Sequence, residues 1–242
     1  MIEIRDVTKT YGKGDNLFTA LYNVSFTIPT GSSVAIIGKS GSGKSTLMHV
    51  MSGLDHTTNG EIVIHGDSLQ SMKPRQIDKF RSREMSFIFQ AFFVEANQTC
   101  YQNVMLPLEI AKVARRSRRK MVLDALKAVG LEEKVNAQAN SLSGGQKQRL
   151  AIARAIVNKP KLIFADEPTG NLDSSTGEMI IKLLFKLNRT LGCTLVIVTH
   201  DPELAQRCKH QIHLKDGQLV QATSPVNAIK RSNKRVIKRM GL

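Results

Sequence analysis

Residues 38–46 read GKSGSGKST, a glycine-rich stretch that lies between two segments of regular pattern. The apolar run VAII at 34–37 precedes it and is typical of a buried strand in a parallel sheet. The segment KSTLMHVMSGL at 44–54 follows it and is predicted to form a helix that ends near Gly53. A strand, a glycine-rich turn and a helix in this order predict a phosphate-binding loop.

The loop matches the pattern G-x4-G-K-[ST], whose glycines let backbone N–H groups turn toward a phosphate. Lys44 is expected to reach the β- and γ-phosphates of a nucleotide, and the hydroxyl of Ser45 is expected to ligate Mg²⁺. A flexible turn rich in glycine and serine is the plain alternative, which the flanking strand and helix disfavour. The candidate nucleotide-binding residues of the loop are Gly38, Ser40, Gly41, Gly43, Lys44, Ser45 and Thr46.

Two further apolar runs, at 162–165 and 195–198, are expected strands that end in polar residues. Strands that alternate with helices predict an α/β domain with its ligand at the carboxyl ends of the strands. Asp166 and Glu167 follow the first of these runs, where Asp166 is a candidate Mg²⁺ ligand and Glu167 a candidate to polarise an attacking water. Many buried strands end in acids, so this assignment depends on the phosphate loop earlier in the chain.

The stretch LSGGQ at 142–146 has the chemistry of a second anion site. Ser143 is predicted to cap the helix that follows, and Gly144 and Gly145 would allow close approach of the backbone to a ligand. An ordinary capped helix is the alternative, but glycine weakens the start of a helix, and this alternative leaves both glycines unexplained. One nucleotide has one γ-phosphate, so two phosphate-binding motifs in one chain require a reason.

The remaining patterns divide the chain into segments of different kinds. EIRDVTKTY at 3–11 and LYNVSFTI at 21–28 alternate loosely, which predicts half-exposed antiparallel strands, and GEIVIHG at 60–66 adds a short strand. From about 91–160 the pattern becomes helical, as in RKMVLDALKAVGL with its stop at Gly130. We therefore expect an α/β core with an antiparallel β part and a helical insertion.

The chain of 242 residues has a formal net charge of +15, and most of the excess is local. RRSRRK at 115–120 holds five basic residues and KRSNKRVIKR at 230–239 holds six. An anionic membrane surface and nucleic acid are both compatible with such patches. A solvated helix face is the plain alternative for the first patch. For the second, an interfacial amphipathic helix and a frayed tail are equally compatible with the pattern.

Cysteine usage and hydropathy indicate a cytoplasmic chain. Cys100, Cys193 and Cys208 are scattered and form no CxxC pair, so neither a disulfide framework nor a zinc site is supported. The N-terminus MIEIRDVTKT lacks the apolar segment of a signal peptide. The apolar runs are far shorter than the roughly 20 residues of a membrane span, so the chain is not expected to cross a membrane by itself.

Seven motifs, taken in order, resemble those of the ATP-binding-cassette ATPases over about 1–222. They are Tyr11, the phosphate loop, Gln90 in FIFQ, LSGGQ, LIFADE, NLD ending at Asp173, and VTH ending at His200. The resemblance implies a P-loop NTPase (RecA-like) core with an antiparallel β subdomain and a helical insertion, at about 91–160, that carries LSGGQ. The resemblance ends at about residue 222, so we expect 223–242 to be a basic C-terminal tail outside the ATPase domain.

In this family two nucleotide-binding domains pair head to tail. The resemblance therefore implies that Ser143 and Gly145 contact ATP held by the phosphate loop of a second copy, so that a homodimer forms on ATP and completes two sites. The further roles that it implies are adenine stacking by Tyr11, Mg²⁺ contact by Ser45, Gln90 and Asp166, coupling between sites by Asp173, and catalysis by Lys44, Glu167 and His200. The implied ligands are ATP and Mg²⁺.

GLD at 53–55 and DEPTGNLD at 166–173 resemble one branch of the family. That branch contains macrolide-exporter, lipoprotein-releasing and antimicrobial-peptide-resistance ATPases. The resemblance implies an ATP-hydrolysing subunit on the cytoplasmic face of the cell membrane that drives a separate permease, in export or mechanotransmission of a lipoprotein, peptide or drug. The loop at 91–104 departs from the branch pattern, which leaves the identity of the permease open.

Two other classes of function are compatible with parts of the sequence. A soluble ATPase acting on nucleic acid or ribosomes would use the +15 charge, but there is no tandem cassette or long coiled-coil insertion, and the chain has three Tyr and no Trp for base stacking. Nucleic acid is therefore not an expected partner. A non-catalytic scaffold that binds ATP is disfavoured by the presence of Glu167.

Overall fold

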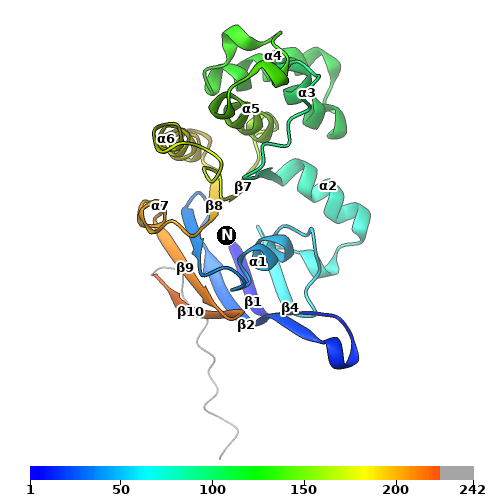
Figure 1. Cartoon of the computed structure of the whole chain (residues 1–242). Helices are drawn as coiled ribbons and strands as arrows, with labels where there is room; N and C mark the ends of the chain where they lie inside the picture. The colour runs from blue at the N-terminus through cyan, green and yellow to red at the C-terminus, as the bar shows by residue number, and fades with distance from the viewer. Residues whose placement is uncertain (224–242) are drawn as a thin grey trace, which may run out of the picture.

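The computed structural model describes residues 1–223, so the basic tail predicted at 223–242 lies outside the described residues except for its first position. The N-terminal part forms a four-stranded antiparallel sheet in the order β2-β1-β4-β5 (Figure 1). Its strands are β1 (Ile2–Tyr11), β2 (Phe18–Ile28), β4 (Asn59–Ile64) and β5 (Asp67–Ser68). The strands predicted from loose alternation are thus confirmed.

A second, six-stranded sheet has the order β10-β9-β3-β8-β7-β6, in which only the edge strand β10 is antiparallel. Its strands are β3 (Ser33–Ile37), β6 (Met85–Ile88), β7 (Leu162–Asp166), β8 (Thr194–Thr199), β9 (His210–Lys215) and β10 (Gln218–Ala222). The three apolar runs of the sequence are β3, β8 and β7, which are neighbours. Their carboxyl ends therefore meet at one edge of the sheet.

Alternate residues of the parallel strands face two separate cores. Val34 and Ile36 of β3 pack in one core with α1 (Lys44–Met51) and the antiparallel sheet, whereas Ala35 packs in the other with the helices that follow β6. Both faces of these short strands are buried, which explains their uninterrupted apolar sequences.

Between β6 and β7 the chain forms three helices, which we call the helical lobe (100–156; upper part of Figure 1). They are α3 (Cys100–Ile110), α4 (Arg115–Ala128) and α5 (Gly144–Ile156), with the short 3₁₀ turns η3 (Glu132–Lys134) and η4 (Ala139–Ser141). These elements fall within the range expected for the helical insertion. The basic run at 115–120 forms the first turns of α4.

Three helices were not predicted from the sequence: α2 (Pro74–Glu84), α6 (Ser174–Leu191) and α7 (Pro202–Gln206). The remaining short elements are the 3₁₀ turns η1 (Gly14–Asn16) and η2 (Leu69–Ser71). Along residues 1–223, no helix combines the length and the apolar character that crossing a membrane requires.

Candidate active site

The phosphate loop joins β3 to α1, and its glycines are required by backbone conformation and by close packing. Gly41 and Gly43 have φ angles of 78° and 97°, in the left-handed region that favours glycine. A Cβ atom at Gly38 would lie 2.4 Å from the carbonyl oxygen of Leu214, and one at Gly43 would lie 2.7 Å from that of Ala20. Side chains at these positions would push the loop away from β9 and β2.

The polar groups of the loop fit a phosphate. The Nζ atom of Lys44 donates to the carbonyl oxygens of Gly38, at 2.8 Å, and Lys39, at 2.9 Å, so a cation is held over the loop. The Oγ atom of Ser42 is buried without a hydrogen-bond partner among the described residues. The first N–H groups of α1 add the positive end of the helix dipole. Ser40, Gly41 and Ser45 are exposed, and Thr46 is half-buried.

The carboxyl ends of β7 and β8 bring Glu167 and His200 together. Oε1 of Glu167 lies 2.7 Å from Nδ1 of His200 and accepts a hydrogen bond from the backbone N–H of His200 at 3.0 Å. The side chain of His200 is 77% exposed, whereas that of Glu167 is 21% exposed, so a mostly covered carboxylate meets an imidazole that a ligand can reach. Glu167 has a φ of 44°, a strained value for a residue with a side chain and one that is typical of functional sites.

Asp166 occupies the end of β7 and fits a divalent cation. Burial raises the pKa of this carboxyl, the neighbouring Glu167 raises it further, and His49 and Lys44 oppose the shift. An added cation would relieve the cost of ionising Asp166. The hydroxyl of Ser45 and the carboxylate of Asp166 supply the oxygen ligands that Mg²⁺ prefers.

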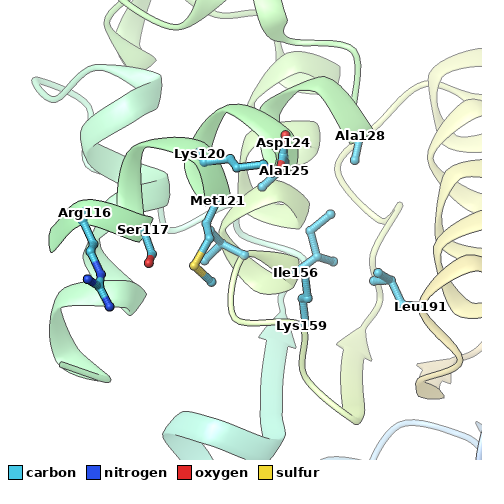
Figure 2. Close-up of a pocket in the computed structure, with 11 residues that line it drawn as sticks. Arg116, Ser117, Lys120, Met121, Asp124, Ala125, Ala128, Ile156, Lys159 and Leu191 are labelled. Atoms are coloured by element: carbon cyan, nitrogen blue, oxygen red, sulfur yellow. The ribbon is translucent and has the colours of Figure 1, made fainter. Parts of the chain in front are cut away.

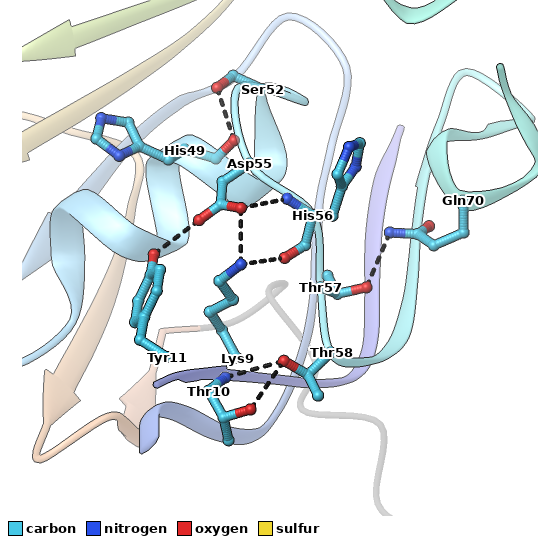
Figure 3. Close-up of polar contacts among 10 residues, drawn as sticks. All are labelled: Lys9, Thr10, Tyr11, His49, Ser52, Asp55, His56, Thr57, Thr58 and Gln70. Atoms are coloured by element: carbon cyan, nitrogen blue, oxygen red, sulfur yellow. Dashed lines mark hydrogen bonds and ion pairs between the residues drawn. The ribbon is translucent and has the colours of Figure 1, made fainter. Parts of the chain in front are cut away.

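Tyr11, at the end of β1, is held by Asp55 and Lys9, two residues that were not predicted from the sequence to belong to the site (Figure 3). Its hydroxyl donates to Oδ2 of Asp55 at 2.8 Å, and Nζ of Lys9 lies 2.7 Å from Oδ1 of Asp55 and 4.6 Å from the centre of the tyrosine ring. Burial by itself would raise the pKa of Asp55, but the hydrogen bonds from Lys9 and Tyr11 outweigh it and hold that pKa below its ordinary value. The ring is therefore fixed in orientation, while Tyr11 remains 40% exposed.

Gln90, which follows β6, lies over the loop after Glu167. Its Nε2 atom donates to Oδ1 of Asn171 at 3.2 Å, and Nδ2 of Asn171 donates back to the carbonyl oxygen of Gln90 at 3.0 Å. A Cβ atom at Gly170 would lie 2.7 Å from Nε2 of Gln90. A side chain at position 170 would therefore displace the Gln90 side chain from this contact, and the expected contact of Gln90 with Mg²⁺ stays a prediction.

Ser143 caps α5, as predicted. Its Oγ atom accepts from the backbone N–H of Gln146 at 3.3 Å, and Oε1 of Gln146 accepts from the backbone N–H of Ser143 at 3.0 Å. A Cβ atom at Gly145 would lie 2.4 Å from Cγ2 of Thr176 in α6. The capped end of α5 is therefore packed directly on the start of α6.

Asp173 caps α6 in the same way. Its Oδ1 atom accepts hydrogen bonds from the hydroxyl of Ser175 at 2.6 Å and from the backbone N–H of Thr176 at 3.0 Å. These bonds lower the pKa of Asp173. The structure thus places the phosphate loop, Asp166, Glu167 and His200 at one edge of the parallel sheet, whereas Ser143 and Gly145 lie on the helical lobe (Figure 1).

The basic run of α4 borders a groove, and Arg116 and Lys120 of that run line it (Figure 2). The groove has a volume of about 590 Å³ and lies between α4, the end of α5 and the end of α6. Its lining includes the apolar side chains of Met121, Ala125 and Ile156 as well as basic residues of the run. The basic run is therefore separate from the nucleotide-binding loop.

A phosphate loop with an acidic pair and a histidine at the ends of neighbouring parallel strands defines a P-loop nucleoside triphosphatase. The sequence profile of the family described as ABC transporter matches residues 21–170. The lipoprotein-releasing system ATP-binding protein LolD of Syntrophotalea carbinolica is 42% identical over 219 residues, which are 90% of this chain and 96% of that protein. The chain belongs to the ABC transporter family, in which it is an ATP-binding subunit and an ATPase.

Solved structures agree with this assignment. The dimeric ATP-binding cassette MJ0796, in a post-hydrolysis state bound to ADP and Pi, has a TM-score of 0.83 and 42% identity, covering 92% of this chain and 98% of that chain. The protein cbiO1 of Clostridium perfringens, part of the ABC transporter complex cbiONQ, has a TM-score of 0.84 and 30% identity, covering 93% and 88%. These relatives are transporter cassettes, and a soluble ATPase acting on nucleic acid is not favoured.

Proposed function

We propose that two copies of this chain pair head to tail on ATP and drive a separate membrane permease. Each copy carries a phosphate loop in the core and a capped glycine-rich helix start, at Ser143 and Gly145, on the helical lobe. A two-fold axis would place each helix start opposite the phosphate loop of the other copy and complete two sites together. The dimeric cassette MJ0796 supports this pairing.

The contact between Glu167 and His200 carries the hydrolytic assignment. Glu167 accepts a proton from a water molecule as the water oxygen bonds to the γ-phosphorus. The bond from that phosphorus to the bridging oxygen then breaks, which leaves ADP and phosphate. Lys44, His200 and the Ser143 hydroxyl of the second copy stabilise the charge on the transferred phosphoryl group.

The other residues of the site bind and orient the nucleotide. Ser45, Asp166 and Gln90 would hold Mg²⁺, which would supply neutralisation of the phosphate charge. Tyr11 stacks on adenine from the orientation that Asp55 and Lys9 give its ring. Asp173, at the start of α6 beside Gly145, couples the two sites of the dimer.

A groove of about 320 Å³ beside the Gln90 loop is the surface that we propose for the permease. Leu106 and Ile110 of α3 line it and are exposed apolar side chains, as expected for a docking surface. Arg154, also in the lining, donates to the carbonyl oxygen of Phe92 at 3.2 Å and so connects the groove to the loop after Gln90. This permease contact would hold the subunit on the cytoplasmic face of the membrane.

The lipoprotein-releasing relative supports an export or mechanotransmission role with a lipoprotein as the substrate. A peptide or a drug is the alternative substrate that the branch resemblance implies. Coupling to a permease would be tested by reconstituting the chain with a candidate permease and measuring whether that permease raises the rate of ATP hydrolysis. A stimulation that Leu106→Asp and Ile110→Asp abolish, with basal hydrolysis unchanged, would support the docking groove. Stimulation that survives both substitutions would contradict it.

Pairing on ATP is tested by size-exclusion chromatography with light scattering on Glu167→Gln, with and without Mg-ATP. We expect a monomer that becomes a dimer with Mg-ATP, because ATP bound by one copy is contacted by α5 of the other. Ser143→Arg added to Glu167→Gln should restore the monomer, since the bulky cation would occupy the place of the γ-phosphate contact. A monomer under all conditions, with ATP binding intact, would contradict the proposed pairing.

A further inference from the structure

Gln148, in the second turn of α5, has a side chain that is wholly buried, with an exposed fraction of 0%. Its Nε2 atom donates to the carbonyl oxygen of Pro168 at 2.6 Å and to that of Phe89 at 3.4 Å. Its Oε1 atom is buried and has no hydrogen-bond partner among the described residues. One amide therefore joins α5 to the loop after β7 and to the loop after β6.

The shorter of these hydrogen bonds acts on the residue next to Glu167. Glu167 has a φ of 44°, which residues with side chains seldom adopt. Its backbone N–H donates to Val198 at 2.9 Å, and its carbonyl oxygen accepts from Gly170 at 3.0 Å. The hydrogen bond from Gln148 to Pro168 fixes the following peptide group, so the unusual backbone conformation is held from several directions.

Fold stability alone does not fully account for a glutamine at position 148. The amide group satisfies the carbonyl oxygens of Pro168 and Phe89, but its own oxygen is buried without a partner, so the unpaired oxygen offsets part of what the two hydrogen bonds contribute to stability. A buried side-chain oxygen that has no hydrogen-bond partner among the described residues calls for an explanation beyond packing.

We propose that Gln148 is a positioning residue for hydrolysis, which orients the Glu167 carboxylate through the carbonyl group of Pro168. This inference rests on the role proposed above for Glu167. The longer hydrogen bond connects the same amide to Phe89, the residue before Gln90. The helix α5, which Ser143 caps, is thereby joined through one buried side chain to both loops of the candidate site.

Gln148→Met tests the proposal, because methionine has nearly the same length and no donor. We expect kcat to fall about tenfold or more, since a small misplacement of a catalytic group can cost as much as a hundredfold, while KM for ATP stays within about threefold. The Gln148→Met variant should still form the dimer with Mg-ATP, and this dimer should last longer than that of the wild type. Lys147→Met, at the preceding position of the same helix, is the matched control and should keep the wild-type kcat.

A double-mutant cycle with Glu167→Gln separates positioning from general damage. In single-turnover hydrolysis, adding Gln148→Met to Glu167→Gln should lower the residual rate by less than about twofold, because the base that Gln148 orients is already absent. Additive losses, a wild-type kcat in Gln148→Met, or loss of its Mg-ATP dimer would each overturn the proposal. The single variant Glu167→Gln tests the proposed role of Glu167 independently, since wild-type hydrolysis by that variant would refute it.

If Gln148→Met does not fold, Gln148→Asn takes its place in the same measurements. Asparagine keeps the amide but is shorter by one methylene, so it does not reach Pro168. The same fall in kcat and the same lack of additivity are then expected, and their absence would overturn the proposal.

Discussion

Glu167 and His200 lie 33 positions apart in the sequence, yet Oε1 of the glutamate is 2.7 Å from Nδ1 of the histidine. They meet because β7 and β8 are parallel neighbours, paired in a register that sets Asp166 beside Val198. The same oxygen also accepts from the backbone of His200 at 3.0 Å. A carboxylate oxygen that is contacted by both the ring and the backbone N–H of His200 is oriented before the nucleotide binds, which reduces the reorganisation needed during hydrolysis.

Substitution of His200 should therefore slow hydrolysis even with Glu167 intact. For His200→Ala we expect kcat to fall by roughly 100-fold, because the base loses its fixed orientation and the phosphoryl group loses a donor. Phosphate release at saturating Mg-ATP measures this. Thr199→Val is the control, since the hydroxyl of Thr199 lies 3.4 Å from Oε2 of Glu167 and should contribute far less. Equal losses in the two variants would contradict the assignment.

Asp166→Asn should stabilise the nucleotide-free protein at neutral and alkaline pH. The pKa of Asp166 is raised by burial and by Glu167, so the folded state binds this proton more tightly than the unfolded state does. Above the raised pKa the ionised carboxylate therefore destabilises the fold, and asparagine removes that effect. We expect Tm at pH 8 to rise by about 2 °C, a gain that disappears below about pH 4. The variant should also lose Mg²⁺-dependent hydrolysis, and a lower Tm at pH 8 would contradict the electrostatic argument.

Asp55→Asn should have the opposite effect on stability. The hydrogen bonds from Lys9 and Tyr11 hold the pKa of Asp55 below its ordinary value in spite of burial, so the ionised form stabilises the fold above about pH 4. We expect a lower Tm than wild type at pH 7, with the difference vanishing as the pH falls through the depressed pKa. Thermal melts of wild type and Asp55→Asn, recorded at steps of about one pH unit between pH 3 and pH 7, measure this difference in Tm.

The same substitution should weaken ATP binding, because asparagine has one acceptor oxygen where the carboxylate has two. Lys9 and the backbone N–H of His56 both donate to Oδ1 and would keep that oxygen, so the hydroxyl of Tyr11 would lose its acceptor. We expect KM for ATP to rise about three- to tenfold with little change in kcat, since adenine lies away from the reacting phosphate. Tyr11→Phe, which keeps the ring and loses only the hydroxyl bond to Asp55, should show a smaller rise in KM. A fall in kcat at unchanged KM would rule out this account of Asp55.

Gly145→Ala should destabilise the protein where Gly144→Ala does not. A Cβ atom at Gly145 would lie 2.4 Å from Cγ2 of Thr176, whereas one at Gly144 would find its closest neighbour at 3.6 Å, an ordinary contact. We expect a loss of about 1–3 kcal/mol in the free energy of unfolding for Gly145→Ala, measured by urea denaturation. Thr176→Ser removes the methyl group and should restore much of the loss, so a double variant no better than Gly145→Ala would refute the steric explanation.

Local sequence patterns were sufficient to predict those structural features whose physical cause is itself local. The glycine-rich loop before Lys44, the apolar strands before Asp166 and His200, and the cap at Ser143 each depend on a few adjacent residues, and the structure shows each in place. The helix α2 was missed although Pro74 stands at its first turn, a known start signal. Its weak apolar pattern, with Ile77 as the single buried residue, left that signal without support.

By itself the sequence determined the class of fold, the phosphate loop, the acidic end of β7 and the separate capped helix of LSGGQ. Only the tertiary structure decided which side chains meet: Asp55 with Tyr11, Glu167 with His200, and Gln148 with the carbonyl oxygen of Pro168. The physical reason is that backbone propensity and apolar periodicity act between near neighbours along the chain. Contacts between the ends of different strands and helices depend instead on sheet order and register, which are settled only when the whole core packs.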